Sequence, residues 1–304
     1  MNRIYAYLGC SKQSFHQRLD RELKQREMEL LLLPIIDQLR QEHPGVAARQ
    51  LYWILKPQGI GRDRFETLCF ANGYKLAKNQ CYTRTTDSSG VVRFPNLVTG
   101  LELTNINQVW VSDITYYQIG YKFYYLTFII DLFSRRIVGY HVSERLLTEH
   151  TTIPALLMAI RERAPAPGLI FHSDGGGQYY CKEFLRITTD AKIKSSMCEM
   201  AYENPNAERI NGTIKNQYLK GYNPTDLLSL KKQTSRAVHN YNYIKPHSSL
   251  QKLSPAHFEK GLPAGGSSPS TDNFCSDSNS TKLHQKNYHS PVRLKIVKET
   301  VNVF

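Results

Sequence analysis

The sequence predicts an α/β protein, with a core built on a mixed sheet and an all-α region in front of it. Three observations support this. Apolar residues recur at helical spacing through the first 80 residues, three β-rich runs follow between residues 108 and 142, and helical and strand-like patterns alternate after that. With 304 residues and 41% hydrophobic content, the chain is long enough for two or three domains and a substantial core.

The chain is strongly basic, with a formal net charge of +13 and an isoelectric point near 9.4. Such a charge predicts an anionic partner, and nucleic acid is the commonest one. The start of the chain lacks the features of a secretory signal, and no apolar run approaches a membrane span, which predicts a cytoplasmic protein. The 6 cysteines are scattered without a Cys-x-x-Cys pair, so reduced thiols are expected rather than zinc ligands.

The N-terminal region predicts a first helix-turn-helix. Gly9 favours a turn, and Ser11 is a suitable cap for a helix that ends near Leu19. This helix would carry Lys12 and Arg18 outward, where they are candidate DNA contacts. A solvated polar face explains the same pattern equally well.

A longer amphipathic helix is expected over Glu22–Arg40, and Pro34 predicts a kink or a restart within it. A second helix-turn-helix follows, with one helix from residue 43 and another from Arg62. Arg62 and Arg64 would lie at the N-terminal end of the recognition helix, where base contacts are usual.

The core begins with three predicted strands, Gln108–Ile119, Lys122–Asp131 and Arg135–Val142, which short turns join into an antiparallel meander. A helix over Thr148–Arg163 leads to a strand at Leu169–Ser173, expected to run parallel to the first. A further helix, strand and helix complete the pattern. This order of elements is the one expected of a ribonuclease-H-like fold.

The expected domains are a helical DNA-binding region at 1–80, a basic linker at 81–104, the core with its C-terminal helices at 105–261, and a flexible tail at 262–304. The linker is basic enough to lie along DNA phosphates, although a simple connector explains it too. In the tail, the alternating run Pro291–Val297 predicts a short terminal strand.

Three acidic residues of the core stand out because of their surroundings. Asp113 lies inside a β-branched and aromatic run, where an unpaired carboxylate is costly to bury. Asp174 ends a short apolar run and is followed by three glycines, a pattern typical of a strand that opens into a loop. Glu208 begins a helical pattern. Each alone is most simply a solvated charge or a cap, but together they predict one metal site.

A fourth acid, Asp131, also has an apolar setting. Ser134 and Arg135 follow it closely, which favours a loop-capping carboxylate over a metal ligand.

Several motifs in this part of the chain occur in a familiar order. They are the segments 110–116, 130–140, 172–179, 196–197, 206–215, 241–250 and 254–255. In these segments the chain resembles transposases of bacterial insertion sequences, in the group whose catalytic domain is similar to retroviral integrase and is named for an Asp, Asp, Glu triad. The resemblance covers about half of the chain.

The resemblance implies that Asp113, Asp174 and Glu208 are the catalytic residues and the metal ligands. Their carboxylate oxygens suit Mg²⁺ or Mn²⁺, and two such ions are expected. The family hydrolyses a phosphodiester at the end of the element, and the freed 3′-hydroxyl then attacks a second phosphodiester.

Two departures from the family pattern affect the site. Asp174 and Glu208 enclose 33 residues where the family usually has thirty-five, and Gly175 stands where the family has Arg. The shorter loop leaves Glu199 and Glu203 as rivals for the third ligand.

Near the triad, the expected DNA contacts are Lys215, which matches a basic residue of the family, together with Arg209 and Gln178. The expected partners are double-stranded DNA, at the ends of the element and at the target, further copies of this chain on that DNA, and a protein from an upstream reading frame. Two other functions are compatible with the same residues: an inactive DNA-binding relative, and a nuclease of the same fold that cuts without joining.

Overall fold

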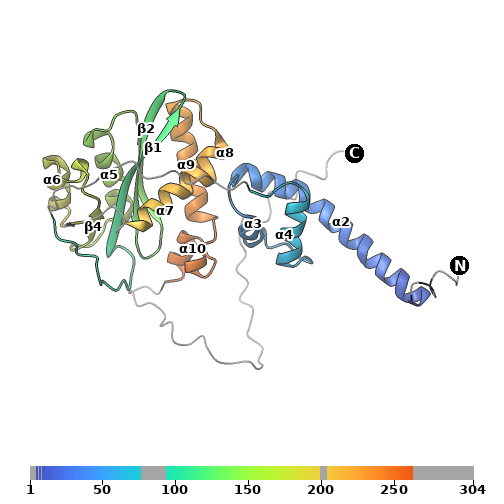
Figure 1. Cartoon of the computed structure of the whole chain (residues 1–304). Coiled ribbons are helices and arrows are strands. Elements are labelled where there is room, and N and C mark those ends of the chain that lie inside the picture. The colour runs from blue at the N-terminus through green and yellow to red at the C-terminus, as the bar shows by residue number, and fades with distance from the viewer. Residues whose placement is uncertain (1–4, 6, 8, 77–93, 199–203, 263–304) are drawn as a thin grey trace. The chain divides into compact units, whose positions relative to one another are not determined.

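The computed structural model describes residues 5, 7, 9–76, 94–198 and 204–262, and Figure 1 shows their arrangement. These residues all fall within one contact unit, 1–268. The predicted terminal strand at 291–297 and most of the predicted linker lie outside the described residues, as do Cys81 and Cys275.

The N-terminal part of the chain is dominated by one continuous helix, α2, over Lys12–Glu42. The predicted break after Leu19 was wrong. Ser11 caps the helix as expected, but no helix-breaking residue separates Leu19 from Glu22. An ion pair of 3.4 Å between Arg18 and Glu22, one turn apart, spans the expected break.

Helix α2 also runs on through Pro34, so the predicted restart does not occur. A proline inside a helix removes one backbone hydrogen bond and costs about 3 kcal/mol. Leu32 and Ile36 flank it and are 9% and 0% exposed. Burial of these two side chains offsets much of that cost, at roughly 1.5–3 kcal/mol each.

The second helix-turn-helix is present as α3, Ala48–Leu55, and α4, Arg62–Ala71. Helix α3 begins later than predicted because His43 ends α2. Gly45 then lies against the core: its N–H donates to the Gln217 carbonyl at 2.8 Å, and a Cβ there would stand 2.5 Å from the Gln217 Cα. The connection between the two helices therefore needs glycine at this point.

The core sheet has the order β3-β2-β1-β4-β5. Strands β1 (Val109–Ile119), β2 (Lys122–Asp131) and β3 (Ile137–Ser143) form the predicted antiparallel meander. Strands β4 (Ile170–Ser173) and β5 (Lys194–Met197) pair parallel to β1 and β4. The mixed sheet predicted from the sequence is confirmed.

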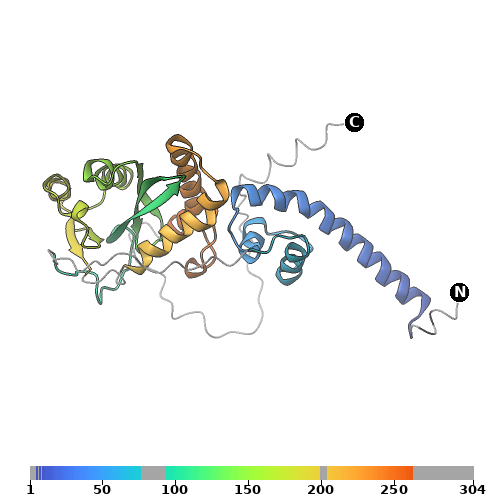
Figure 2. The same ribbon diagram turned by 45° about the horizontal axis from the view of Figure 1, so that its top comes forward.

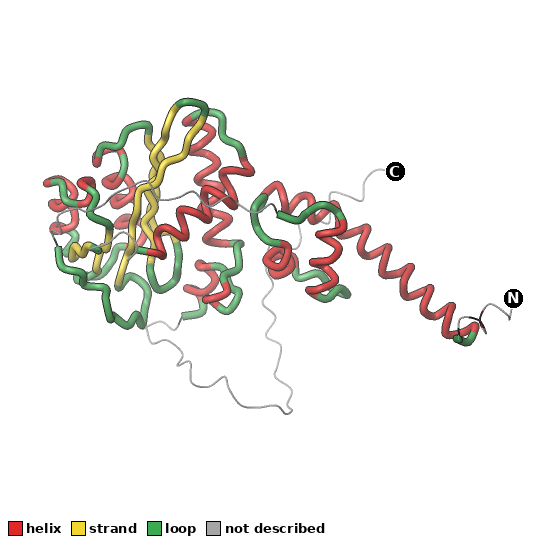
Figure 3. Tube along the Cα trace, viewed as in Figure 1, coloured by secondary structure: helices red, strands yellow, loops and turns green. Residues whose placement is uncertain are grey.

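Helices cover both faces of the sheet, as Figures 1 and 2 show and as the strands and helices in Figure 3 make clear. They are α5 (Thr152–Arg163), α6 (Lys182–Asp190), α7 (Pro205–Thr213), a π-helical segment (Ile214–Leu219), α8 (Lys220–Tyr222), α9 (Leu227–Tyr243) and α10 (Pro255–Lys260). Short 3₁₀ turns lie at Thr148–His150, Gly177–Tyr179 and Ser248–Leu250.

The two faces of the sheet form two apolar clusters because side chains alternate along a strand. On β2, Ile129 packs in the cluster of α5 and α6, while its neighbours Phe128 and Ile130 pack in the cluster of α7 and α9. Gly139 on β3 allows α5 to approach, since a Cβ there would stand 2.3 Å from the Ala155 carbonyl. This layered arrangement is the predicted ribonuclease-H-like order.

Candidate active site

The pairing of β1 with β4 brings two of the predicted carboxylates together. Ser112 of β1 pairs with Ser173 of β4, and this is the last pair of the parallel ladder. Asp113 and Asp174 come next in each strand. Because paired strands lie about 4.8 Å apart, both aspartates leave the end of the ladder side by side.

Helix α7 and the π-helical segment run alongside β1, which carries the third carboxylate towards the other two (Figures 1 and 2). Alternate residues of the strand meet every fourth residue of the helix. The contacts are Asn211 Nδ2 to Asp113 Oδ2 at 2.8 Å, Lys215 Nζ to Thr115 Oγ1 at 3.0 Å, and Tyr117 Oη to the Leu219 carbonyl at 3.2 Å. Glu208 lies in the first turn of α7, three residues before Asn211.

The electrostatics show that Asp174 and Glu208 act on Asp113. The pKa of Asp113 is raised to about 7, mainly by burial and in part by the charges of Asp174 and Glu208, against donors at Ile114 and Asn211. Burial also raises the pKa of Asp174, while the Gly176 N–H, at 3.2 Å, opposes that rise. Negative charge therefore collects here at a cost that a cation would relieve.

The donor set suits a hard divalent ion, because carboxylate oxygens are the ligands that Mg²⁺ and Mn²⁺ prefer. Among the residues that the structure describes, no three acidic, histidine or cysteine side chains are yet grouped closely enough to hold a metal ion. Glu208 is exposed in the first turn of α7. The rival ligands Glu199 and Glu203 lie outside the described residues.

A buried hydrogen-bond chain lies next to the two aspartates, and no pattern in the sequence indicated it. The Tyr179 hydroxyl lies 3.0 Å from Ser112 Oγ, which donates to the Phe128 carbonyl at 3.0 Å. Burial raises the pKa of Tyr179 well above its ordinary value, and the charges of Asp174 and Asp113 add to this. The chain ties the loop after β4 to β1, and so fixes the spacing of the aspartates.

Lys215 lies within the π-helical segment, two turns beyond Glu208. Besides its bond to Thr115, its ammonium group stands 4.9 Å from the centre of the Tyr116 ring. Burial lowers its pKa, against the nearby charge of Asp113. Short π-helical segments that interrupt an α-helix, like the one that carries Lys215, are frequent at functional sites.

The loop after β4 carries the other predicted contact, Gln178. Its Nε2 points to the Leu146 carbonyl at a long 3.4 Å. A Cβ on Gly176 would come within 3.0 Å of Asp174 Oδ1, so the loop is fitted closely around the aspartate. Arg209 is exposed on α7, next to Glu208.

The predicted DNA contacts of the helical region are mostly held in ion pairs. Arg62 binds its neighbour Asp63 at 2.7 Å. Arg64 binds Glu29 of α2 at 2.6 Å. Lys12 and Arg18 are exposed on α2. Arginines in such pairs must exchange partners to contact phosphate.

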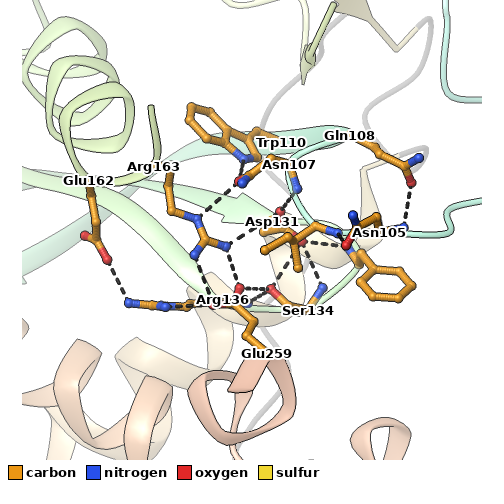
Figure 4. A network of polar contacts seen from close by, with 12 residues as sticks. Asn105, Asn107, Gln108, Trp110, Asp131, Ser134, Arg136, Glu162, Arg163 and Glu259 are labelled. Atoms are coloured by element: carbon orange, nitrogen blue, oxygen red, sulfur yellow. Dashed lines mark hydrogen bonds and ion pairs between the residues drawn. The ribbon is translucent and has the colours of Figure 1, made fainter. Parts of the chain in front are cut away.

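The fourth acid, Asp131, is fully buried and has the loop-capping role that the sequence favoured (Figure 4). Its carboxylate accepts from the N–H groups of Asn107 at 2.6 Å, Phe133 at 3.1 Å and Ser134 at 2.9 Å. Its oxygens are thus already occupied, which excludes it from the triad.

Beside Asp131 lies an ion-pair network that sequence reasoning missed (Figure 4). Glu259 of α10, 7% exposed, binds Arg163 at 2.5 Å and Arg136 at 2.7 Å. It also accepts from Ser134 Oγ at 2.7 Å. The network fastens α10 to β3 and α5.

His172, at the end of β4, is 2% exposed, and its Nδ1 lies 2.9 Å from Ser196 Oγ on β5. This contact indicates a structural role rather than one in positioning substrate.

In the described part of the chain, no helix combines the length and apolar character needed to cross a membrane.

The sheet order, with one carboxylate within the central strand β1, one just after β4 and one on the helix beside them, defines the ribonuclease-H-like class of nucleic-acid enzymes. Comparison with known proteins narrows this class. Residues 104–202 match a model of the integrase core domain, and residues 190–255 match a second model of that description. The chain belongs to the family of insertion-sequence transposases that carry an integrase core domain.

Two relatives are similar over most of their length. The insertion element IS600 uncharacterized 31 kDa protein of Shigella sonnei is 32% identical over 263 residues, which cover 83% of this chain and 96% of that protein. The transposase for insertion sequence element IS904 of Lactococcus lactis is 28% identical over 253 residues, covering 81% and 98%.

Two solved structures are also similar. The HTLV-2 integrase catalytic core domain in complex with magnesium is 25% identical, with a TM-score of 0.41, and the match covers 51% of this chain and 97% of that chain. A chain of the simian T-cell lymphotropic virus intasome is 18% identical, with a TM-score of 0.48, and the match covers 76% and 80%.

Proposed function

We propose that Asp113, Asp174 and Glu208 are the catalytic carboxylates of a DNA transposase, and that they hold its divalent ions. The observation that carries this is the effect of the charges of Asp174 and Glu208 on Asp113, next to the end of the β1–β4 ladder. Such an accumulation of buried negative charge is characteristic of functional sites.

When bound, two Mg²⁺ or Mn²⁺ ions would activate the attacking oxygen and stabilise the leaving one. The chain supplies the ligands and their orientation. Asn211 orients Asp113 by donating its side-chain amide to Oδ2. Glu208 completes the set from α7.

The same site serves both reactions of the family. In hydrolysis, a water oxygen bonds to phosphorus, and the bond from phosphorus to the 3′ oxygen breaks to free a 3′-hydroxyl. In strand transfer, that 3′ oxygen bonds to a phosphorus of the target and displaces the oxygen already bound there. Neither step requires a covalent bond to the protein, so no Ser or Tyr nucleophile is needed.

We assign the DNA contacts to two regions. Near the triad they are Lys215, Arg209 and Gln178; in the helical region they are Lys12, Arg18, Arg62 and Arg64. Lys215 is the strongest of these, because its ammonium group lies two strand residues beyond Asp113, next to an exposed aromatic ring.

The protein is further proposed to act in the cytoplasm as a homo-oligomer on double-stranded DNA, with an upstream-frame protein as an additional partner. The domain division at 1–80, 81–104, 105–261 and 262–304 is part of this proposal.

Strand transfer in Mn²⁺ tests the function. Labelled duplexes that carry the ends of the element flanking the gene are incubated with wild type and with Asp113→Asn, Asp174→Asn and Glu208→Gln. Wild type is expected to cut and join, and each variant to bind DNA without cutting.

Other outcomes select the alternatives. A wild type that binds but never cuts is an inactive relative, and one that cuts without joining is a nuclease. If the Glu208→Gln variant stays active, the third metal ligand is Glu199 or Glu203 instead of Glu208.

A further inference from the structure

A group of basic side chains lies where three elements meet: the turn between β2 and β3, the first turn of α7, and the segment after α9. Its members are Arg135, Arg209 and Lys245, with His247 beside them. Lys245 and His247 belong to the motif 241–250, to which the carboxylate triad assigns no role.

Arg135 is fixed at both its backbone and its side chain. Its φ of +63° places it in the left-handed region, which is costly for a residue with a side chain. The Tyr241 hydroxyl donates to its carbonyl at 3.0 Å, and its Nη1 donates to Asn206 Oδ1 at 2.6 Å. The guanidinium is therefore held at the first turn of α7, where Arg209 also lies.

Lys245 is unusual because it is 6% exposed and yet makes no side-chain hydrogen bond or ion pair with any described residue. Burial lowers its pKa to about 8. The His247 ring stands 4.8 Å from that of Tyr241, and within the described ranges its buried Nε2 has no hydrogen-bond partner. A buried polar atom without a partner is costly, so this nitrogen beside a largely buried lysine indicates a missing ligand.

Two charges in this cluster, those of Arg135 and Arg209, repel each other. Burial lowers the pKa of Arg135, and the charge of Arg209 lowers it further. Burial lowers the pKa of His247 to about 3, and Lys245 and Arg135 add to that effect. In the part of the chain that the structure describes, Arg135, Arg209 and Lys245 have no carboxylate within ion-pair distance. Asp131 does act on Arg135, but its oxygens are bonded to backbone N–H groups.

We propose that Arg135, Arg209 and Lys245 bind a backbone phosphate of DNA beside the carboxylate triad. This inference rests on the proposed function for the identity of the ligand as DNA. A phosphate has several acceptor oxygens and a full negative charge, which match one ammonium and two guanidinium groups. It also accepts from the otherwise unpartnered Lys245.

The position of the cluster on α7 locates this phosphate relative to the chemistry. Glu208, Asn211 and Lys215 form one row along the helix, facing β1. Arg209 follows Glu208 directly and begins the adjacent row. Since each helical residue adds about 1.5 Å, the bound phosphate lies within a few nucleotides of the phosphodiester under attack. DNA would thus contact Lys215 on one side of the triad and the Arg135 cluster on the other.

Equilibrium binding without divalent metal tests the site apart from catalysis. The full chain is titrated against a fluorescent 30-base-pair duplex of the element's end, in EDTA, at several KCl concentrations. Arg209→Gln and Lys245→Gln are each expected to weaken binding about fivefold and to lower the salt slope by up to about 0.9, the value of one phosphate contact. Lys245→Arg should restore most of the affinity.

Lys182→Gln is the matched control, because Lys182 is exposed on α6 and far in sequence from the cluster. If Arg209→Gln and Lys245→Gln bind the duplex with the same affinity as this control, and the salt dependence of binding is unchanged, the proposed phosphate site is overturned. Absence of duplex binding by wild type would overturn it as well. Arg209 is exposed, so its variant keeps the test decisive if Lys245→Gln fails to fold.

Thermal unfolding in inorganic phosphate, compared with KCl of equal ionic strength, gives a second measurement. Wild type should gain stability from phosphate, and Arg209→Gln should gain less. An equal gain in both would contradict the proposal. If wild type binds the duplex normally without metal but does not cut DNA in Mn²⁺, the result counts against the proposed function and not against the phosphate site.

Discussion

Asp113 and Asp131 lie on neighbouring paired strands, β1 and β2, and both are acids in apolar surroundings, yet they differ in how their charge is balanced. Asp131 is fully buried and is surrounded by N–H donors. Asp113 is half-buried, accepts from Asn211, and faces two further carboxylates. Burial alone therefore does not identify a functional acid; a shortage of compensating donors does.

The same contrast extends to the neighbours of each acid. Around Asp131, the carboxylate of Glu259 balances Arg136 and Arg163, so that the network is complete within the protein. Around Asp113, the described residues leave the negative charge in excess. Of these two neighbouring sites, the one around Asp131 is balanced within the protein, and the one around Asp113 is the proposed cation site.

The largest expected effect is on catalysis. Asp113→Asn should reduce strand transfer by about 10³-fold, equivalent to about 4 kcal/mol, because it removes a proposed metal ligand. Its melting temperature should stay at or above that of wild type, since the substitution relieves repulsion. Asp131→Asn should do the opposite, with a lower melting temperature and retained activity. If Asp113→Asn strongly lowers the melting temperature, Asp113 is a structural acid like Asp131, and the proposed difference between the two acids is wrong.

The second effect is on stability. Glu259→Gln should lower the free energy of unfolding by about 3–5 kcal/mol, because it leaves Arg136 and Arg163 buried without their counter-ion. Urea unfolding measures this. Glu183→Gln, which removes an exposed pair with Arg186 on α6, is the control and should change it by less than about 1 kcal/mol. Equal losses in the two variants would contradict a structural role for the network.

The third effect is a pH dependence in metal-free protein. The folded pKa of Asp113, about 7, lies above its unfolded value, so the folded state binds more protons and stability falls as pH rises. Between pH 5 and 7 this amounts to about 2 kcal/mol. Asp113→Asn should abolish this contribution, and Mg²⁺ should offset it in wild type. Urea unfolding at both pH values, with EDTA or Mg²⁺, measures this; an identical pH slope in the variant would count against it.

The smallest effect concerns the hydrogen bond next to the aspartates. Tyr179→Phe and Ser112→Ala should each cost about 1 kcal/mol, and the double variant should cost less than their sum because they share one bond. A double-mutant cycle in urea measures the coupling. Exactly additive losses would show that the two hydroxyls do not act as a pair.

Local patterns predicted much of the fold. The strands fell within two residues of their predicted bounds because alternation and short turns mark them, and Asp174 was placed by the glycines that follow it. Asn211 had a readable signal as well, since it lies three residues after Glu208 and so on the same helix face. The two helix errors had different causes: no residue between Leu19 and Glu22 breaks the helix, and at Pro34 the burial of Leu32 and Ile36 outweighs the local effect of proline.

The contacts of Glu259 had no such local signal. Its partner Arg163 is 96 residues away in the sequence, and an exposed Glu in a short helix would look the same. Only the packing of α10 against the sheet determines that this carboxylate is buried. Similarly, no sequence pattern indicated the π-helical segment at Ile214–Leu219.

The position of Glu259 near the end of the described chain has a consequence for synthesis on the ribosome. Arg136 and Arg163 leave the ribosome about 100 residues before their counter-ion does. Contacts over such a separation form late, because a long loop must close first. The core therefore reaches full stability only once α10 has emerged, so a nascent chain cannot become a fully stable strand-cutting enzyme before that point.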